Sequence, residues 1–348
     1  MADTKNRTSR WVGIDVSKST FDASLHPVLQ PGQAKPSLGD LPKAKFKRTE
    51  SGVDEFLCWL DRTGDGPAGT RAVMEATGRY STELALMLIR KRGDLAPAIV
   101  NPRNTCNFAR SLNVKNKNDR LDAAVLARYG AERFPAPWAP KAPEYGELQE
   151  LVRQRAFLVK SLTESRNRLT ELTEFPDIAK LQKTVVARME KTLEKAEEMI
   201  RQLIAGHAML NRDVNLLTSI PGVGFVTTAT VLGEIGDLRA FRTSRRLSSF
   251  AGLSPVQRTS GTSVNGKTRM SKMGSPEVRR VLYMAAVSIY GKDNDLADFG
   301  RQLVENGKNK MQALGAMMRK LLVLMRAVLI SGVEYRNGFL GKNPNHAA

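Results

Sequence analysis

The sequence is poor in cysteine and histidine, the residues that build disulfide frameworks and many catalytic sites. Only Cys58 and Cys106 occur among 348 residues, and they stand alone. Neither a disulfide framework nor a thiolate zinc site is therefore indicated, and a reducing cytoplasm suits the chain. The three histidines, His26, His207 and His346, stand in unrelated contexts, so the sequence offers no evident histidine base for a nucleophile.

Long hydrophobic runs are also missing. The most apolar late segment, residues 311–330, contains Arg319, Lys320 and Arg326. These charges disfavour a membrane-spanning helix and favour an amphipathic core helix. Residues 1–10 are polar and lack the apolar stretch of a secretion signal. We expect a cytoplasmic protein with no membrane partner.

Acidic residues are scarce relative to basic ones. The chain has 54 Lys and Arg against 35 Asp and Glu, which gives a net charge of +19 and a pI near 10.1. This excess predicts a polyanionic partner, and nucleic acid is the first candidate. The alternative is that the charge serves only solubility or attraction to acidic membranes. The length is enough for two or three domains, each with its own core.

Residues 10–140 alternate short β-type runs with helical ones. The succession β-β-β-α-β-α-β-α is the order of a ribonuclease-H-like domain. Predicted strands cover residues 11–15, 21–25, 45–48, 71–75 and 98–100, and predicted helices cover 53–60, 80–92 and 118–133. The polar excursion between His26 and Pro42 is longer than this pattern needs.

A Pro-rich segment, residues 135–143, separates this region from a charged helical one. Residues 141–206 carry apolar residues at helical spacing, with a break at Phe175-Pro-Asp. The spacing suits a two-helix antiparallel hairpin or an intermolecular coiled coil. We predict that this segment mediates oligomerisation; a plain helical bundle without a partner is the alternative.

The third region, residues 207–335, contains Pro221-Gly-Val-Gly between two helical stretches. This pattern is typical of a helix-hairpin-helix element, in which Gly222 and Gly224 would let backbone N–H groups approach a phosphate. Glycines in a helix turn are also often simple caps. Between Arg239 and Arg280 there are ten basic residues and one acid, Glu277, which favours nucleic-acid binding.

Four carboxylates end or begin the predicted elements of the first region. Asp15 and Glu75 close two strands, while Asp119 and Asp122 lie three apart at the start of a helix. Four such side chains could hold two Mg²⁺ ions for an in-line displacement at phosphorus, with Lys115 and Lys117 close enough in sequence to hold phosphate. Two acids three apart on a helix are otherwise commonly just solvated.

Residues 258–275 form a segment rich in hydroxyls, glycines and cations, which we expect to be a loop lying along a nucleic-acid backbone. A serine in it could attack phosphorus if a metal polarised its oxygen. On the residues alone, the stronger interpretation is that this segment binds phosphate and that its serines have no covalent role. The cations expected to contact phosphate are Arg258, Lys267, Arg269 and Lys272.

Seven short motifs, in order along the chain, resemble those of the DEDD insertion-sequence transposases. The family's relatives include a pilin-gene invertase and the RNA-guided bridge recombinases. The motifs are Gly13-Ile-Asp-Val-Ser-Lys, Met74-Glu-Ala-Thr-Gly-Arg-Tyr, Val100-Asn-Pro-Arg, Lys115-Asn-Lys-Asn-Asp-Arg-Leu-Asp-Ala, Ser219-Ile-Pro-Gly-Val-Gly, Phe250-Ala-Gly-Leu-Ser-Pro and Ser260-Gly. Arg103, in the third motif, is a further expected nucleic-acid contact.

The resemblance implies an α/β plus α architecture in three parts. These are a RuvC-like (ribonuclease-H-like) domain over residues 10–140, a coiled-coil segment over 141–206, and a mainly helical C-terminal transposase domain over 207–335. Asp15, Glu75, Asp119 and Asp122 fall on the family's four acidic positions, and Ser260 falls on its nucleophilic serine. For the 258–275 segment, the resemblance thus favours a catalytic serine over phosphate binding alone.

The resemblance also implies the chemistry and the partners. The serine would form a transient 5′-phosphoserine link while the acids of a partner subunit bind Mg²⁺, or Mn²⁺ in its place. Donor and target double-stranded DNA, a non-coding bridge RNA, and a homodimer assembling to a tetramer are the implied partners, in a prokaryotic nucleoid-associated setting. Sequence choice would belong to base pairing.

The sequence therefore predicts a DNA recombinase of an insertion sequence. The closest rival is a hydrolytic nuclease of the RuvC junction-resolving type, in which water attacks and Ser260 only binds phosphate. A third possibility is a non-catalytic protein that packages RNA or DNA, in which the acids are merely structural.

Overall fold

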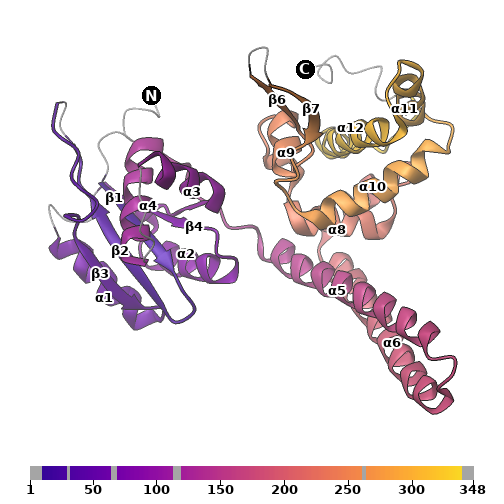
Figure 1. Ribbon diagram of the computed structural model, residues 1–348, viewed down its shortest axis with the longest axis horizontal. Coiled ribbons are helices and arrows are strands. Elements are labelled where there is room, and N and C mark those ends of the chain that lie inside the picture. The colour runs from indigo at the N-terminus through magenta and orange to yellow at the C-terminus, as the bar shows by residue number, and fades with distance from the viewer. Residues whose placement is uncertain (1–9, 30–31, 64–68, 113–118, 261–263, 339–348) are drawn as a thin grey trace. The chain divides into compact units, whose positions relative to one another are not determined.

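The computed structural model describes residues 10–29, 32–63, 69–112, 119–260 and 264–338. The chain folds into two compact units, Met1–Pro140 and Lys141–Ala348 (Figure 1). The first unit is a sheet with helices on both faces. The second unit is mainly helical and contains one β-hairpin.

The first unit is built on a five-stranded mixed sheet in the order β3-β2-β1-β4-β5. β1, β2 and β3 are antiparallel neighbours, whereas β1, β4 and β5 run parallel. The strands are β1 (Arg10–Val16), β2 (Thr20–His26), β3 (Lys43–Lys47), β4 (Thr70–Glu75) and β5 (Ala98–Val100). The carboxyl ends of β1 and β4 therefore meet at one edge of the sheet.

Two hydrophobic clusters cover the two faces of this sheet. One face packs Phe21 and Met74 against α1 (Glu50–Arg62) and α2 (Arg79–Lys91), which is followed by the 3₁₀ turn η1 (Gly93–Leu95). The other face packs Trp11 and Val73 against Leu126 of α4 (Asp119–Arg133). Because strand side chains alternate, odd-numbered residues of β1 and β4 lie on the α4 face.

β1 and α4 approach so closely that no side chain fits between them. A Cβ atom on Gly13 would lie 2.1 Å from the carbonyl oxygen of Ala123 and from the amide nitrogen of Ala127. Farther along, a Cβ atom on Gly130 would lie 2.5 Å from the ring of Trp11. These two contacts also show that β1 and α4 run in opposite directions.

One helix of this unit, α3 (Pro102–Ser111), lies where the sequence pattern predicts no element. Asn101 caps it by accepting a hydrogen bond from the backbone N–H of Arg103 at 2.9 Å, and Pro102 occupies the first turn. Asn followed by Pro is a strong helix start, so the sequence does contain a signal for α3. α3 packs beside α4, with the ring centroids of Phe108 and Tyr129 5.4 Å apart.

In the second unit, α5 (Pro143–Glu171) and α6 (Pro176–Gly206) form an antiparallel hairpin within the chain. Arg155 pairs with Glu197 at 2.8 Å and Arg166 with Glu190 at 2.6 Å, which fixes the register of the two helices. At the base of the hairpin, residues such as Leu148 enter the core of the unit. The structure thus favours the hairpin among the expected arrangements.

Five of the remaining helices pack around α12 (Lys310–Ser331), whose apolar residues are buried over most of its length. They are α7 (Ala208–Thr218), η2 (Leu238–Ala240), α9 (Ser244–Phe250), α10 (Pro276–Tyr290) and α11 (Asp295–Glu305). The sixth, α8 (Phe225–Ile235), packs against α5, α7 and α10. The expectation of a core helix near residues 311–330 is confirmed. Every helix among the described residues is too short or too polar to cross a membrane.

Glu234 of α8 fastens the helical hairpin to the rest of the second unit. This buried carboxylate accepts a hydrogen bond from Arg153 of α5 at 2.7 Å. Lys141 donates to the carbonyl oxygens of Gly233 and Glu234 at 3.1 and 2.8 Å. Burial favours a raised pKa for Glu234, but the hydrogen bonds and charge of Arg153 outweigh burial and lower that pKa.

Candidate active site and nucleic-acid interface

Asp15 and Glu75 lie at matching positions on adjacent parallel strands. Each comes one residue after the paired residues Ile14 of β1 and Met74 of β4. Neighbouring strands are about 4.8 Å apart, and residues level with each other point to the same face. Both carboxylates therefore lie on the face of the sheet that α4 covers, and both are half-buried.

The start of α4 faces this same edge of the sheet. Gly13 lies against Ala123 and Ala127, so the position two residues farther along β1, Asp15, is level with the first turn of α4. Asp122 precedes Ala123 and is half-buried, and Asp119 is the first residue of the helix, although its side chain lies outside the described residues. The backbone thus directs three elements, β1, β4 and α4, to one corner of the unit.

Thr105 of α3 holds the carboxylate of Glu75. Its buried hydroxyl donates a hydrogen bond to Oε1 of Glu75 and also lies 2.9 Å from the carbonyl oxygen of Pro102. The contact fixes the Glu75 side chain from the helix that the sequence analysis missed. Thr105 is therefore a positioning residue that sequence reasoning did not identify.

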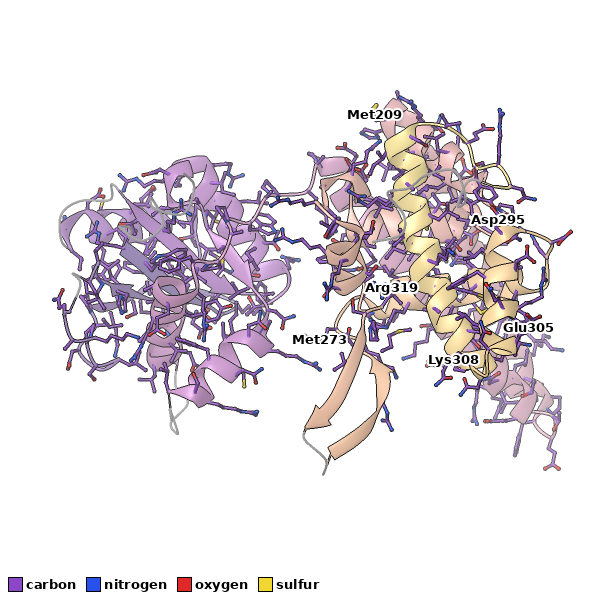
Figure 2. The ribbon with its side chains drawn as sticks, turned by 90° about the horizontal axis from the view of Figure 1, so that it is seen from above. Met209, Met273, Asp295, Glu305, Lys308 and Arg319 are labelled. Carbon is purple, nitrogen blue, oxygen red and sulfur yellow. The ribbon has the colours of Figure 1, made fainter. Side chains whose placement is uncertain are left out.

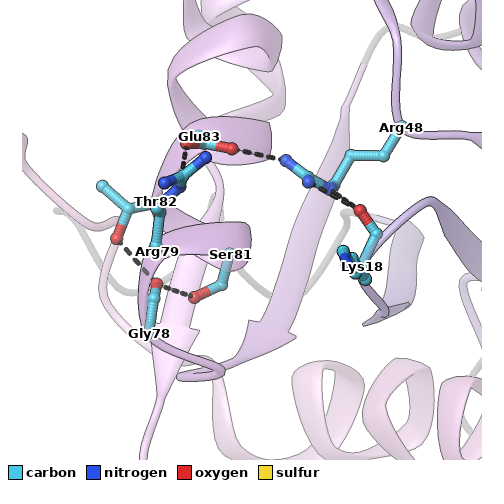
Figure 3. Close-up of polar contacts among 7 residues, drawn as sticks. All are labelled: Lys18, Arg48, Gly78, Arg79, Ser81, Thr82 and Glu83. Atoms are coloured by element: carbon cyan, nitrogen blue, oxygen red, sulfur yellow. Dashed lines mark hydrogen bonds and ion pairs between the residues drawn. The ribbon is translucent and has the colours of Figure 1, made fainter.

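Arg48 links the turn after β1 to α2, the helix that follows β4 (Figure 3). Its guanidinium donates to the carbonyl oxygen of Lys18 at 2.6 Å and to Glu83 of α2 at 2.5 Å, and it lies 4.6 Å above the ring of Tyr80. The hydrogen bond from Arg48 lowers the pKa of Glu83. One side chain thus joins the turn after Asp15 to the helix that follows Glu75.

A further carboxylate, Asp22, stands directly opposite Asp15 on β2. It is buried and pairs with Lys45 of β3, whose Nζ lies 3.3 Å away. The row formed by Lys45, Asp22, Asp15 and Glu75 therefore crosses four adjacent strands on one face. No sequence motif marks Asp22, because only the register of the hairpin brings it next to Asp15.

The donor set at this corner suits a hard divalent cation, since Asp15, Glu75 and Asp122 all offer carboxylate oxygens. Among the side chains that the structure describes, no three Asp, Glu, His or Cys residues gather tightly enough to hold a metal ion as they stand. Asp119, the remaining expected ligand, does not belong to the described side chains.

Ser260 lies on a β-hairpin, where the sequence analysis expected a loop. β6 (Pro255–Ser260) pairs with β7 (Val264–Met270), and Ser260 is the last residue of β6, opposite Val264. An irregularity in register occurs between Val256 and Arg258. Strands give the segment a fixed path that its Ser, Thr and Gly content did not indicate. The side chain of Ser260 lies outside the described ones.

The expected phosphate contacts fall into three groups. Arg103, Arg269 and Lys272 have exposed side chains. Arg258 and Lys267 lie on the β6–β7 hairpin, but their side chains lie outside the described ones. Lys115 and Lys117 lie outside the described residues altogether.

The two glycines of the Pro221-Gly-Val-Gly turn have different environments. Gly222 has φ +82°, and a Cβ atom there would lie 2.5 Å from Ile289, so conformation and packing both require glycine. Gly224 caps α8 in extended conformation and has open space beside it. Of the two, only Gly224 leaves room for a ligand near the helix start.

Comparison with known proteins identifies the family. A model described as the Transposase IS116/IS110/IS902 family matches residues 214–301, and an IS110-type DEDD transposase model matches residues 12–175. The pilin gene-inverting protein of Moraxella bovis is 31% identical over 322 residues, which cover 92% of this chain and 95% of the relative. The chain belongs to the IS116/IS110/IS902 family of transposases. Membership of the family makes it an enzyme of DNA recombination with DNA as its substrate.

Other relatives in the family carry insertion-element names. An uncharacterized 43.6 kDa protein of insertion element IS110 from Streptomyces coelicolor is 29% identical over 91% of this chain and 78% of its own length. The transposase for insertion sequence element IS1111A from Coxiella burnetii is 27% identical over 69% of this chain and 73% of its own. The similarity to the family thus spans both structural units.

Proposed function

We propose that this transposase cuts and rejoins DNA strands through a phosphoserine intermediate on Ser260, assisted by Mg²⁺ at the DEDD tetrad. The observation that carries the proposal is the placement of Asp15 and Glu75 at matching positions of β1 and β4, level with the start of α4. In this proposal the first unit is the RuvC-like domain, residues 141–206 are the oligomerisation segment, and residues 207–335 form the transposase domain.

Asp15, Glu75, Asp119 and Asp122 would hold the Mg²⁺, or Mn²⁺ in its place. Bound there, the ion would supply charge neutralisation at the scissile phosphate. Thr105 keeps Glu75 in one orientation, and Arg48 joins the turn after β1 to α2. These contacts preorganise the acidic corner before DNA binds.

The covalent step on Ser260 balances without a co-reactant. The Ser260 oxygen forms a bond to phosphorus, the bond from phosphorus to the 3′ oxygen breaks, and the serine proton ends on the released 3′ hydroxyl. A 3′ hydroxyl of a second strand then attacks the phosphoserine and returns the proton to Ser260. Each step exchanges one phosphodiester bond for another, so strand joining needs no external energy source.

Because the acids and Ser260 lie in different units of the chain, we propose that one active site combines the acids of one subunit with the serine of another. The helical hairpin offers a surface for such association. Phe157, Phe175, Ile178 and Leu181 are all more than half exposed on α5, α6 or the connection between them. Large apolar side chains that are exposed in a single chain favour burial against a second copy. A homodimer assembling to a tetramer is the proposed state.

The proposal includes guidance by a non-coding bridge RNA of the element, in a cytoplasmic, nucleoid-associated setting. The charge of +19 provides for contacts with RNA as well as with donor and target DNA. Sequencing the RNA that copurifies with the chain tests this part. A structured transcript from beside the gene supports it, whereas random cellular RNA contradicts it.

The central experiment separates recombination from hydrolysis. Ser260→Ala should abolish both strand exchange and the protein–DNA adduct on a denaturing gel, while Asp15→Asn should abolish cleavage and retain DNA binding. If Ser260→Ala still cuts DNA, the chain is a RuvC-type hydrolytic nuclease, the competing function. If Asp15→Asn recombines normally, the acids are structural.

A further inference from the structure

The second unit contains a broad groove, here called the basic groove, with a free volume of about 1500 Å³. Its walls come from the base of the β6–β7 hairpin and from α9, α10, α11 and α12. Lys308, just before α12, and Arg319, in the middle of α12, both line it (Figure 2). The groove lies wholly within one compact unit, so its geometry does not depend on the other.

The groove is lined by cations and by no acids. Eight Lys and Arg residues line it, and its lining includes no Asp or Glu. Arg280 pairs with Glu277 at 2.9 Å, and the other seven form no ion pair with an acid among the described residues. Like charges gathered at one site repel one another, so this arrangement is stable only with an anionic ligand or with screening ions.

The interior of the groove is apolar and partly aromatic. Tyr283 and Phe299 line it half-buried, with Met270 and Met318 beside them. The Nζ atom of Lys320 lies over the ring of Phe299, 4.1 Å from its centre, so a cation stands against one face of this ring. Cations around aromatic and apolar side chains suit single-stranded nucleic acid, whose phosphates contact the cations and whose bases stack on the rings. A duplex keeps its bases stacked inside and has little use for an apolar interior.

The groove is continuous with the strand that carries Ser260. Pro255 and Met270 pair at the base of the hairpin, and both line the groove. Ser260 is the last residue of β6, which begins at Pro255, so the two lie about 17 Å apart along the strand. A few nucleotides of an extended strand span such a distance.

We propose that the basic groove binds a short single strand of DNA next to the phosphate that Ser260 attacks. The position of that phosphate rests on the proposed function, whereas the binding of unpaired DNA does not. The groove would keep the cleaved strand in place between breakage and rejoining. Its ligand is unpaired DNA, as opposed to duplex DNA, RNA or an acidic protein segment.

The test measures binding to full-length Ser260→Ala protein. This variant lacks the proposed nucleophile, so the measurement reports binding without strand cleavage. The probes are a labelled DNA oligonucleotide of about eight nucleotides, the RNA of the same sequence, and a DNA hairpin duplex. The groove variant is Arg245→Gln/Lys308→Gln/Arg319→Gln. The matched control is Lys183→Gln/Lys195→Gln/Lys292→Gln, which removes the same charge from exposed residues outside the groove.

The groove variant should bind the DNA oligonucleotide at least about tenfold more weakly and lower the salt slope by about two. The control variant should change neither quantity, and duplex binding should fall much less in the groove variant. Equal losses in the two triple variants, or equal losses for the duplex, overturn the proposal. A greater loss for RNA than for DNA also overturns it, since RNA is then the ligand.

Tyr283 provides a second, charge-neutral measurement. Tyr283→Leu should weaken single-strand binding about tenfold through lost stacking, and Tyr283→Phe should retain it. Thermal unfolding shows whether either variant disturbs the fold. Absence of a phosphoserine adduct in the wild-type protein, with groove binding intact, would reject the proposed function alone. An adduct in the wild-type protein without specific groove binding would reject the groove alone.

Discussion

Thr105 of α3 donates its hydroxyl hydrogen to Glu75 at the last position of β4. The donor is buried, so water cannot replace it when the hydroxyl is removed. A residue of α3 thus supports the acidic corner, although α3 contains none of the four expected acids.

Thr105→Val should therefore lower the strand-cleavage rate about tenfold and raise the Mg²⁺ concentration needed for half the maximal rate, because Glu75 loses its orientation. Titration of the cleavage rate with Mg²⁺ measures both effects. Thr105→Ser should restore them, and Ser111→Ala, a hydroxyl removed from the same helix, is the control. An unchanged Mg²⁺ dependence in Thr105→Val would show that Glu75 needs no such support.

Gly13→Ala should destabilise the first unit by at least about 2 kcal/mol. The added methyl group would meet the backbone of α4 at Ala123 and Ala127, and a helix backbone cannot move aside as a side chain can. Thermal or urea unfolding of the full chain measures the change. Gly93→Ala, in the same unit with open space around it, should remain close to wild type.

Arg153→Met should destabilise the second unit at neutral pH by about 2 kcal/mol, because Glu234 would stay buried without its partner. This figure is lower than for a fully buried pair, since the side chain of Arg153 is 51% exposed to solvent. Arg166→Met, which breaks the more exposed pair with Glu190, should cost much less. Urea unfolding measures both variants.

The same ion pair should show a defined pH dependence. The folded-state pKa of Glu234 lies below its ordinary value of 4.5, so its contribution to stability is present above pH 4.5. That contribution is lost as the pH falls through the folded-state pKa. The stability gap between wild type and Arg153→Met should therefore narrow below about pH 4.5. A gap that widens in acid would contradict this assignment.

Arg269→Gln should weaken DNA binding to a similar degree for different sequences and lower the salt slope by about one, as expected for a phosphate contact. Lys267→Gln should behave in the same way. Fluorescence anisotropy at several salt concentrations measures this on two single-stranded DNA oligonucleotides of unrelated sequence. Unequal effects on the two sequences would indicate that Arg269 reads bases.

Much of the first unit could be predicted from sequence because two of its apolar runs lead directly into the candidate metal ligands Asp15 and Glu75. The apolar runs before Asp15 and Glu75 identify two strands, each of which has an acid at or next to its end. Because these two strands run parallel, the two acids lie at the same edge of the sheet. The partners of these acids could not be predicted. Asp22 reaches Asp15 through the register of β1 and β2, and Thr105 reaches Glu75 through the packing of α3.

The basic groove shows the other limit of sequence reasoning. Arg269 and Lys272 stand in a basic segment that attracts notice, whereas Arg245, Lys308 and Arg319 come from separate elements. Their convergence depends on how α12 packs against α10 and on where the hairpin leaves the core. Likewise, the polar composition of residues 258–275 predicts a loop, and only pairing across the hairpin makes strands of it.

The division of the chain after Pro140 has a genetic consequence, given the proposed two-subunit site. One allele that lacks Asp15 and another that lacks Ser260 would each be inactive alone. Mixed assemblies of their products would still contain a complete set of functional groups. Cells that carry both alleles should recover recombination by complementation, and an element with a broken copy could be mobilised by a differently broken relative.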